Sequence, residues 1–152
     1  MTFHVAGLDH TGLTVTDIQR SIRLWRDVLG FTHSRTFEIT GDFAAGLTGR
    51  AGAHTTHAIG SREGRAVELV ECLSPHDTEH LRPRPCDVGS VRVALTVDGM
   101  HAAPGAPVEV GCTPVGAPQP IPDGTRRGSL FVYVHGPDRV TIELIQLTHP
   151  GT

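Results

Sequence analysis

The chain alternates between apolar and polar side chains over several short stretches, each typical of a β-strand. In residues 8–16, Leu13 and Val15 fall on one face, because successive side chains of a strand point to opposite faces. His10 and Gly12 share the other face, where the glycine leaves room beside the imidazole. Alternation or a short apolar run predicts further strands at 31–39, 54–60, 65–72, 90–98, 128–134 and 139–146.

A helical period follows the first strand. Apolar residues, Trp25 among them, recur at near-helical spacing with arginines between them, and they predict a helix over 17–29. Thr16 and Gln19 fit a capping box, in which each side chain binds the free amide of the other residue. Gly30 stands where a left-handed residue ends a helix most easily.

Glycine and proline mark the remaining segments. The Gly-rich residues 41–53 are predicted to form a loop, and the proline-containing residues 74–89 are predicted to form a linker. Residues 99–107 stand where a second helix is expected, but Pro104 and Pro107 leave room for barely one turn. Most of the second helix is therefore predicted to be lost.

The second half of the chain repeats the first. The Leu-Thr-Val text at 13–15 returns at 95–97, and each copy opens a similar series of strands. A repeat at about half the chain length predicts two like modules, 7–73 and 88–147, joined by the linker 74–87 and packed about a pseudo-twofold axis.

The repeat gives four strand residues equivalent places: Arg92 stands where His10 stood, and Glu143 stands where Glu68 stood. A charged glutamate between apolar strand neighbours is costly unless it is paired or bound to a cation. The functional interpretation is a site where imidazole and carboxylates meet a divalent metal or a proton-bearing substrate. The structural alternative is a buried ion-pair cluster, in which Arg92 satisfies both carboxylates.

Composition narrows the class of protein. The 152 residues carry a net charge of −3, which argues against nucleic acid because phosphate neutralisation needs a basic face. No apolar run approaches the length of a membrane span, and no signal peptide is visible. Three cysteines without paired spacing predict reduced thiols, so we expect a cytoplasmic protein.

Weaker signals concern histidines and aromatic residues. The pairs His54/His57 and His76/His80 have spacings seen among metal ligands, but we predict that they are solvated, since the first pair points to opposite faces of a strand. Candidate substrate-binding residues are Phe43, Phe131, Tyr133 and Arg126. A plain solvent-exposed turn is the alternative for Arg126.

These motifs resemble a known superfamily. The matching stretches are Asp9–Val15, Ser21–Phe31, Val67–Leu69, Val93–Asp98 and Pro137–Leu144. They are similar to the vicinal oxygen chelate superfamily, which includes glyoxalase I, methylmalonyl-CoA epimerase, extradiol dioxygenases, and bleomycin- and fosfomycin-resistance proteins. The resemblance covers residues 7–147 and is closest to glyoxalase I and the epimerase.

The resemblance implies a fold and a site. It implies a single α+β domain over 1–152, in which two βαβββ modules form a cupped, half-open barrel. The metal-dependent members take their ligands from the first and last strands of each module, at positions that correspond to His10, Glu68, Arg92 and Glu143. The departure is Arg92, because arginine offers no lone pair and adds a fixed positive charge.

Three interpretations follow from this departure. A divalent metal binds through His10, Glu68 and Glu143 while Arg92 turns away; or the metal is lost and His10 works as an acid or base; or the cup only binds a ligand. We favour loss of the metal, with no cofactor.

The predicted function is that of an isomerase, epimerase or lyase acting on a small carbonyl- or enol-bearing molecule of secondary metabolism. His10 or Glu143 would move a proton, Glu68 would complete the site, and Arg92 would stabilise negative charge. The alternatives are a metal-free, drug-sequestering resistance protein and a metal-dependent glyoxalase- or dioxygenase-like enzyme. We expect a homodimer with a small-molecule partner, and neither nucleic acid nor membrane as partners.

Overall fold

The computed structural model describes residues 2–100 and 111–148 of the chain. Contacts along the chain divide it into two compact units, Met1–Glu79 and His80–Thr152, which we call unit 1 and unit 2. In the described part of the chain, no helix combines the length and apolar character that crossing a membrane requires.

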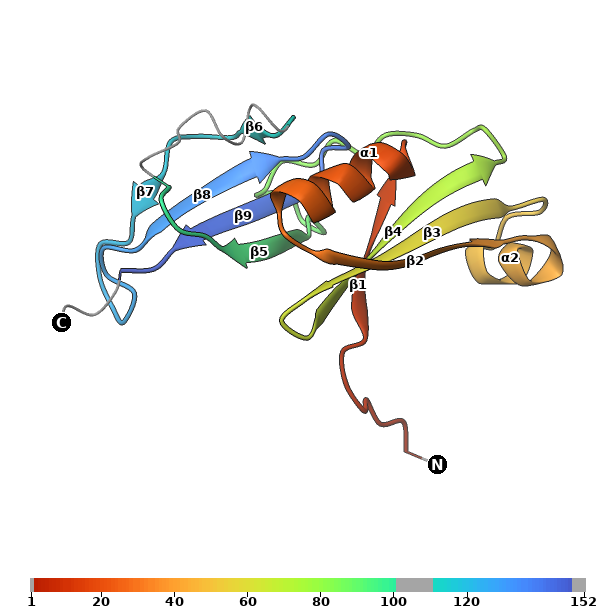
Figure 1. Ribbon diagram of the computed structural model, residues 1–152, viewed down its shortest axis with the longest axis horizontal. Coiled ribbons are helices and arrows are strands. Elements are labelled where there is room, and N and C mark those ends of the chain that lie inside the picture. The colour runs from red at the N-terminus through yellow and green to blue at the C-terminus, as the bar shows by residue number, and fades with distance from the viewer. Residues whose placement is uncertain (1, 101–110, 149–152) are drawn as a thin grey trace. The chain divides into compact units, whose positions relative to one another are not determined.

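Unit 1 contains one mixed sheet with the strand order β1-β4-β3-β2 (Figure 1). β1 pairs parallel with β4, whereas β4–β3 and β3–β2 are antiparallel. The strands are β1 His10–Val15, β2 Thr32–Ile39, β3 His54–Arg62 and β4 Arg65–Ser74. As predicted, Leu13 and Val15 of β1 are buried, while His10 and Gly12 lie on the exposed face.

The predicted helix between β1 and β2 is confirmed. It begins as α1, Ile18–Arg23, and continues as a turn of π-helix, η1, Leu24–Val28. Gly30 follows with φ 71°, the left-handed conformation that ends a helix. Trp25, which is 5% exposed, packs edge-to-face against the ring of Phe31 with 4.9 Å between centroids.

The predicted capping box at the start of this helix is wrong. Asp17, not Thr16, is the N-cap residue, and its carboxylate accepts a hydrogen bond from the amide of Arg20 at 2.8 Å. The carboxylate of Glu71 on β4 accepts from the amide of Ile18 at 3.0 Å. Two carboxylates thus bind free amides of the first turn, where the helix dipole also favours negative charge.

The predicted loop over 41–53 is also wrong in its first part, because Gly41–Thr48 forms a helix, α2. Ala44 is completely buried and anchors α2 in unit 1. Gly49 ends the helix in the left-handed conformation, with φ 68°. The four glycines between 41 and 52 favoured the loop prediction, although the same segment also contains good helix formers.

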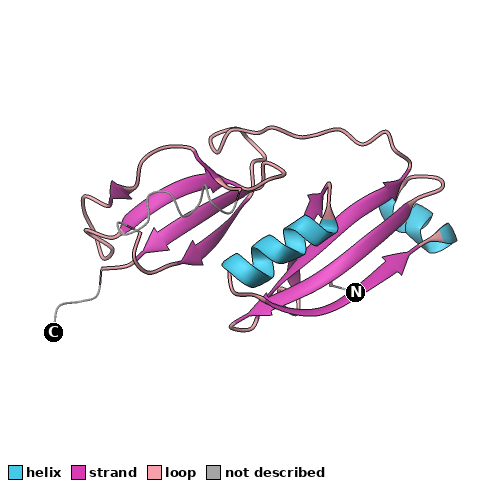
Figure 2. Cartoon of the chain, turned by 45° about the horizontal axis from the view of Figure 1, so that its top comes forward, coloured by secondary structure: helices cyan, strands magenta, loops and turns pink. Residues whose placement is uncertain are grey.

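Unit 2 contains a second sheet with the order β5-β9-β8-β6, and β7 also pairs with β8 (Figure 2). β5 pairs parallel with β9, and β9 pairs antiparallel with β8. The strands are β5 Arg92–Thr96, β6 Thr113–Pro114, β7 Gln119–Pro120, β8 Leu130–His135 and β9 Thr141–Gln146. The three longer strands match predicted ones, whereas β6 and β7 were not predicted.

The prediction that most of the second helix is lost concerns residues 99–107, and residues 101–107 lie outside the described part of the chain. Among residues 80–100 and 111–148, unit 2 contains strands and connecting segments and no helix.

Candidate functional site

His10 stands at the start of β1 with a carboxylate on each ring nitrogen. Its Nδ1 lies 2.7 Å from Oδ2 of Asp9, and its Nε2 lies 3.0 Å from Oε2 of Glu68. A neutral imidazole has a single N–H, so both contacts are hydrogen bonds only when the ring is protonated. The hydrogen bond to Asp9, with the negative charge of Glu68, raises the pKa of His10 above its ordinary value despite partial desolvation.

The sheet register brings Glu68 to this histidine. Glu68 on β4 is paired with Gly12 on β1, two residues beyond His10 on the same face. A Cβ placed on Gly12 would meet Oε2 of Glu68 at 4.0 Å, so the carboxylate extends over the space that the glycine leaves free. The room that the sequence indicated beside Gly12 is thus occupied by the Glu68 carboxylate, which reaches His10 within unit 1.

His57 is the site residue that the sequence did not reveal. It was predicted to be solvated, but it is 5% exposed and its Nδ1 lies 3.0 Å from Oε1 of Glu68. The prediction treated His57 only as one of a pair with His54, and it failed because His57 points to the face that carries Glu68. His54 is half-buried and binds Glu38 instead, with Nε2 2.8 Å from Oε2.

In unit 2, Arg92 and Glu143 form an ion pair. Nε of Arg92 donates to Oε2 of Glu143 at 3.0 Å, and the side chains are 44% and 13% exposed. The Arg92 guanidinium also lies over the ring of Tyr133, 5.2 Å from its centroid. The carboxylate raises the pKa of Arg92 further, so the guanidinium stays charged throughout the physiological range.

The two ion pairs hold equivalent places in their sheets. Glu68 is in register with the residue two positions after His10, and Glu143 is in register with Ala94, two positions after Arg92. Each glutamate then reaches back to the first residue of the parallel strand. The predicted equivalence of His10 with Arg92, and of Glu68 with Glu143, therefore matches the register of both units.

The candidate substrate-binding residues have varied surroundings. Phe43 lies on α2 and is 69% exposed, while Arg126 is exposed in the turn between β7 and β8. Phe131 and Tyr133 are half-buried on β8 and lie on the face that carries Glu143, because Tyr133 is in register with Glu143.

Unit 2 has two buried polar atoms that the sequence gave no reason to single out. His135 and Thr141 face each other across β8 and β9 and are 8% and 2% exposed. Nδ1 of His135 and Oγ1 of Thr141 have no hydrogen-bond partner among the described residues. Burial and the charge of Arg139 lower the pKa of His135. Thr141 is also in register with Arg92, so these atoms share the face of the ion pair.

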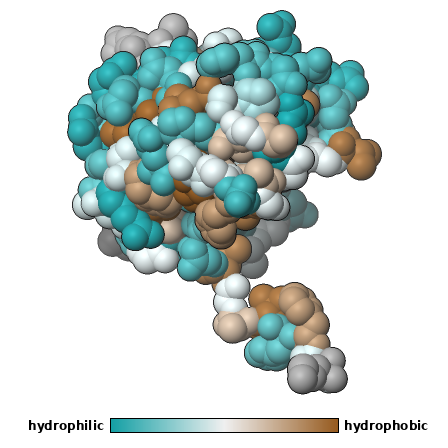
Figure 3. Space-filling view, turned by 90° about the vertical axis from the view of Figure 1, so that its right-hand side faces the viewer, coloured by the Kyte–Doolittle hydropathy of each residue, from teal (hydrophilic) through white to brown (hydrophobic). Residues whose placement is uncertain are grey.

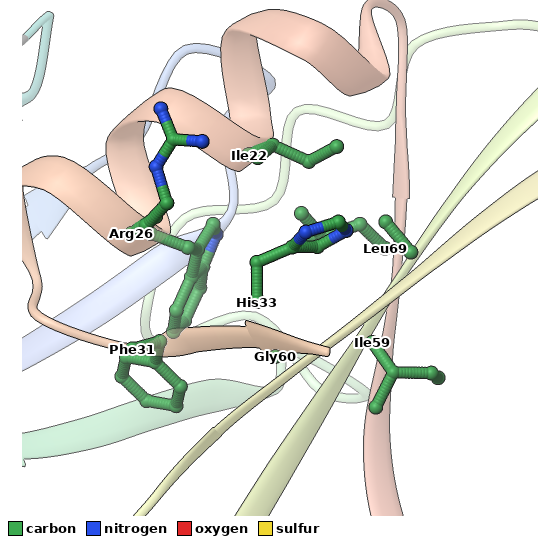
Figure 4. A pocket seen from close by; sticks show the side chains of 9 residues that line it. Ile22, Arg26, Phe31, His33, Ile59, Gly60 and Leu69 are labelled. Atoms are coloured by element: carbon green, nitrogen blue, oxygen red, sulfur yellow. The ribbon is translucent and has the colours of Figure 1, made fainter. Parts of the chain in front are cut away.

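A small cavity in unit 1 lies between α1–η1 and strands of the sheet (Figure 4). Its volume is about 10 Å³, and its wall includes Ile22, Phe31, His33 and Leu69. This space accommodates at most one water molecule, so it is a packing feature and not a substrate pocket.

In the described part of the chain, no three His, Cys, Asp or Glu side chains are grouped so that they could hold one metal ion. All three cysteines are free, and burial raises the pKa of the Cys112 thiol.

Comparison with known proteins identifies the family. Residues 7–144 match the Glyoxalase/Bleomycin resistance protein/Dioxygenase superfamily. The chain belongs to this superfamily. Its members share the vicinal oxygen chelate fold that the sequence motifs predicted. No curated protein matches the chain.

Solved structures support the fold of this superfamily member. A glyoxalase family protein from Bacillus cereus has a TM-score of 0.81 at 17% identity, with 97% of both chains covered. A glyoxalase I variant from Zea mays has a TM-score of 0.62 at 18% identity, covering 92% of this chain and 44% of that one. FosX from Listeria monocytogenes, complexed with Mn(II) and sulfate, has a TM-score of 0.59 at 13% identity, with 95% of both chains covered. The predicted α+β fold with βαβββ-like modules is confirmed.

Proposed function

We propose that this superfamily member is a small-molecule isomerase, epimerase or lyase in which His10 transfers a proton. The observation that supports the proposal is the imidazole of His10 held between the carboxylates of Asp9 and Glu68. Its raised pKa keeps the ring protonated to higher pH than an isolated histidine.

The two carboxylates suggest different roles for the two ring nitrogens. The side chain of Asp9 is 95% exposed, whereas that of Glu68 is 18% exposed. A substrate can displace the exposed Asp9 from Nδ1 more easily than it can displace Glu68 from Nε2. We therefore assign proton transfer to Nδ1 of His10 and orientation of the ring to Glu68, as in other sites where a carboxylate orients a catalytic imidazole.

The proposed substrate is a small molecule with a carbonyl or enol group. In the acid form, His10 gives a proton to the enol or enolate, and the neutral ring then removes a proton from the carbonyl form in the reverse direction. The carboxylate of Glu68, which stays at Nε2, stabilises the imidazolium that results. For Arg92 in unit 2 we propose the general role of a fixed positive charge for an anionic group, since its guanidinium is 44% exposed.

Proton exchange with solvent tests the proposal. The protein is incubated in D2O with a panel of ketones, thioesters and hydroxyketones, each with an acidic proton on the carbon next to its carbonyl. Loss of this α-proton signal is followed by NMR. We expect catalysed exchange that His10→Ala reduces by about a hundredfold or more. His54→Ala is the matched control, because His54 also binds a carboxylate and lies on the other face of the sheet. Exchange that survives His10→Ala, or tight binding without exchange, would contradict the proposal, and the latter would favour a sequestering protein.

A metal-dependent reaction is the second candidate, because one structural relative, FosX from Listeria monocytogenes, contains Mn(II). His10 and Glu68 offer suitable ligand atoms, but Arg92 takes the equivalent place in unit 2 and already donates to Glu143. A guanidinium has no lone pair for a metal and repels it by charge. In unit 2, Arg92 and Glu143 therefore do not fit a metal ion.

Metal content distinguishes the two candidates. We expect the purified protein, after incubation with Mn²⁺ or Zn²⁺ and desalting, to retain much less than one equivalent by elemental analysis. Arg92→His replaces the guanidinium with a ligand and is expected to raise retention toward one equivalent, whereas Arg92→Lys, which keeps the positive charge, is not. Stoichiometric metal in the unmodified protein would favour the metal-dependent reaction.

A further inference from the structure

His57 lies at the buried end of a chain of polar contacts that leads to His10. It is on β3, and each of its ring nitrogens has one partner. Nδ1 lies 3.0 Å from Oε1 of Glu68, and Nε2 lies 2.8 Å from Oγ1 of Thr55. The other carboxylate oxygen of Glu68, Oε2, binds His10. One glutamate is thus shared between a buried histidine and an exposed one.

The partners determine which nitrogen of His57 carries the proton. An ionised carboxylate only accepts hydrogen bonds, so Nδ1 of His57 must donate to Glu68. The hydroxyl of Thr55 can then donate to the lone pair on Nε2. A neutral ring with its proton on Nδ1 satisfies both contacts, and no charge on His57 is required in this buried position.

Aromatic stacking holds the ring plane of His57. Phe37 on β2 is the direct cross-strand neighbour of His57, and the two rings stack with 5.1 Å between centroids and 11° between planes. The guanidinium of Arg35 lies over the Phe37 ring, 5.0 Å from its centroid. The imidazole is thus fixed by two hydrogen bonds and a stacked ring, so its Nδ1–H has a defined direction.

We propose that His57 is a positioning residue, which orients the carboxylate of Glu68 toward Nε2 of His10 by donating from Nδ1 to Oε1. Without this donor, Oε1 loses its buried partner and the carboxylate is free to rotate away from His10. The role rests on the function proposed above for His10, but the contacts that define it lie entirely within unit 1.

Unit 2 lacks this support at the equivalent place. Ile59 is in register with Glu68, and Tyr133 is in register with Glu143. His57 stands two residues before Ile59, so its counterpart on β8 is Phe131, which has no hydrogen-bond donor on its side chain. Glu68, which binds the ionisable imidazole of His10, therefore also binds the buried His57. At the place that corresponds to His57, unit 2 has the apolar ring of Phe131.

The titration of His10 provides a test that needs no substrate. Imidazole nitrogen resonances are followed by NMR against pH in the full-length protein and in His57→Phe, His57→Asn and His57→Gln. Asparagine places its amide near the position of Nδ1 and keeps the donor to Glu68, whereas glutamine extends toward the position of Nε2. The ionisable and charged groups around His10 are Asp9, which directly precedes β1, Glu68 on β4, and His57 and Arg35 beyond it.

We expect His57→Phe to lower the pKa of His10 by the part of the shift that Glu68 causes, while the larger effect of Asp9 remains, and His57→Asn to restore most of the difference. His57→Gln is expected to restore less. Where a substrate shows exchange, kcat should fall about tenfold in His57→Phe with little change in KM, and recover in His57→Asn. His54→Phe is the control, because His54 is on the same strand and binds Glu38, which does not contact His10.

A well-folded His57→Phe variant, judged by circular dichroism and amide dispersion, with an unchanged His10 titration would overturn the proposal. Equal effects of asparagine and phenylalanine would also overturn it, because only the first keeps the donor. These outcomes are distinct from failure of the proposed function. If the unmodified protein exchanges no substrate proton, the His10 titration still shows whether His57 orients Glu68.

Discussion

At the scale of single residues, His10 links the site to pH. The raised pKa of His10 means that the folded protein binds the imidazole proton more tightly than the unfolded chain does. This contribution to stability is complete below about pH 6.5, the ordinary histidine value, and is lost as the pH rises through the folded-state pKa. The contact with Asp9 is the largest cause of the shift.

Replacement of Asp9 tests this link. Asp9→Asn should lower the pKa of His10 and reduce the free energy of unfolding at pH 6, and this loss should shrink as the pH rises to 9, because the stabilisation is lost as His10 deprotonates. Urea unfolding at the two pH values measures the difference. A loss of stability of equal size at both pH values would show that the Asp9 contact does not depend on the His10 proton.

Thr141 is a residue where removal of a polar group should stabilise the fold. Its hydroxyl is buried and has no hydrogen-bond partner among the described residues. Thr141→Val keeps the β-branched shape and removes the unpaired group, so we expect the free energy of unfolding to rise by about 1 kcal/mol. Chemical denaturation measures it, and Thr141→Ser, which keeps the hydroxyl, should not stabilise. A valine variant less stable than the unmodified protein would indicate that the hydroxyl has a partner.

The sequence was sufficient to find four candidate site residues, but it was not sufficient to find His57. His10, Glu68, Arg92 and Glu143 could be found because they stand at equivalent places in a repeat, and their pairings follow from strand register. His57 could not be found in this way, because its contact with Glu68 runs diagonally between strands and depends on the register of β3 against β4. A buried partner for Glu68 was needed on physical grounds, but the sequence does not say which strand supplies it.

At the scale of elements, the first helix depends on side chains outside its own apolar pattern. Asp17→Ala removes the carboxylate that binds the Arg20 amide and should cost about 1 kcal/mol of folding free energy. Thr16→Ala should cost less, because Thr16 is not the N-cap residue. Thermal unfolding of the two variants measures the order. A larger loss for Thr16→Ala would support the capping box predicted from the sequence.

The helix α2 shows why an element can be missed when its residues give opposing signals. Glycines at 41, 46, 49 and 52 favour a loop, and this signal dominated the prediction. Phe43 and Leu47 are spaced one turn apart, Asp42 lies in the first turn, and Gly49 ends the helix. These features together are a helix signal. Burial of Ala44 adds a tertiary contribution that propensities do not contain.

At the scale of the whole molecule, the two units use one sheet register for different electrostatics. In unit 1 the repeated glutamate is shared by two imidazoles, of which His10 is exposed and can bind or release a proton. In unit 2 the same glutamate is neutralised by a guanidinium that stays charged. The repeat therefore preserves the register of the glutamate against the parallel strand. The first residue of that strand, His10 or Arg92, decides whether the glutamate is paired with an ionisable ring or with a fixed positive charge.

The apolar segment before β1 bears on assembly, which the sequence predicted to be a homodimer. Phe3, Val5 and Leu8 are 90%, 68% and 91% exposed, and Figure 3 shows apolar surface along this extended segment. Large exposed apolar side chains close together are typical of surfaces that are covered by a partner. We therefore expect this segment to contribute to a homodimer.

Light scattering coupled to size-exclusion chromatography should give twice the chain mass of 16.2 kDa for the unmodified protein. The double replacement Phe3→Ser and Leu8→Ser should shift the mass toward that of one chain without changing the circular dichroism, because neither side chain is part of a core. Val88→Ser is the control, since Val88 is also fully exposed but lies in the segment between β4 and β5. A dimer that persists in the double variant would place the interface elsewhere, and a monomeric unmodified protein would contradict the predicted assembly.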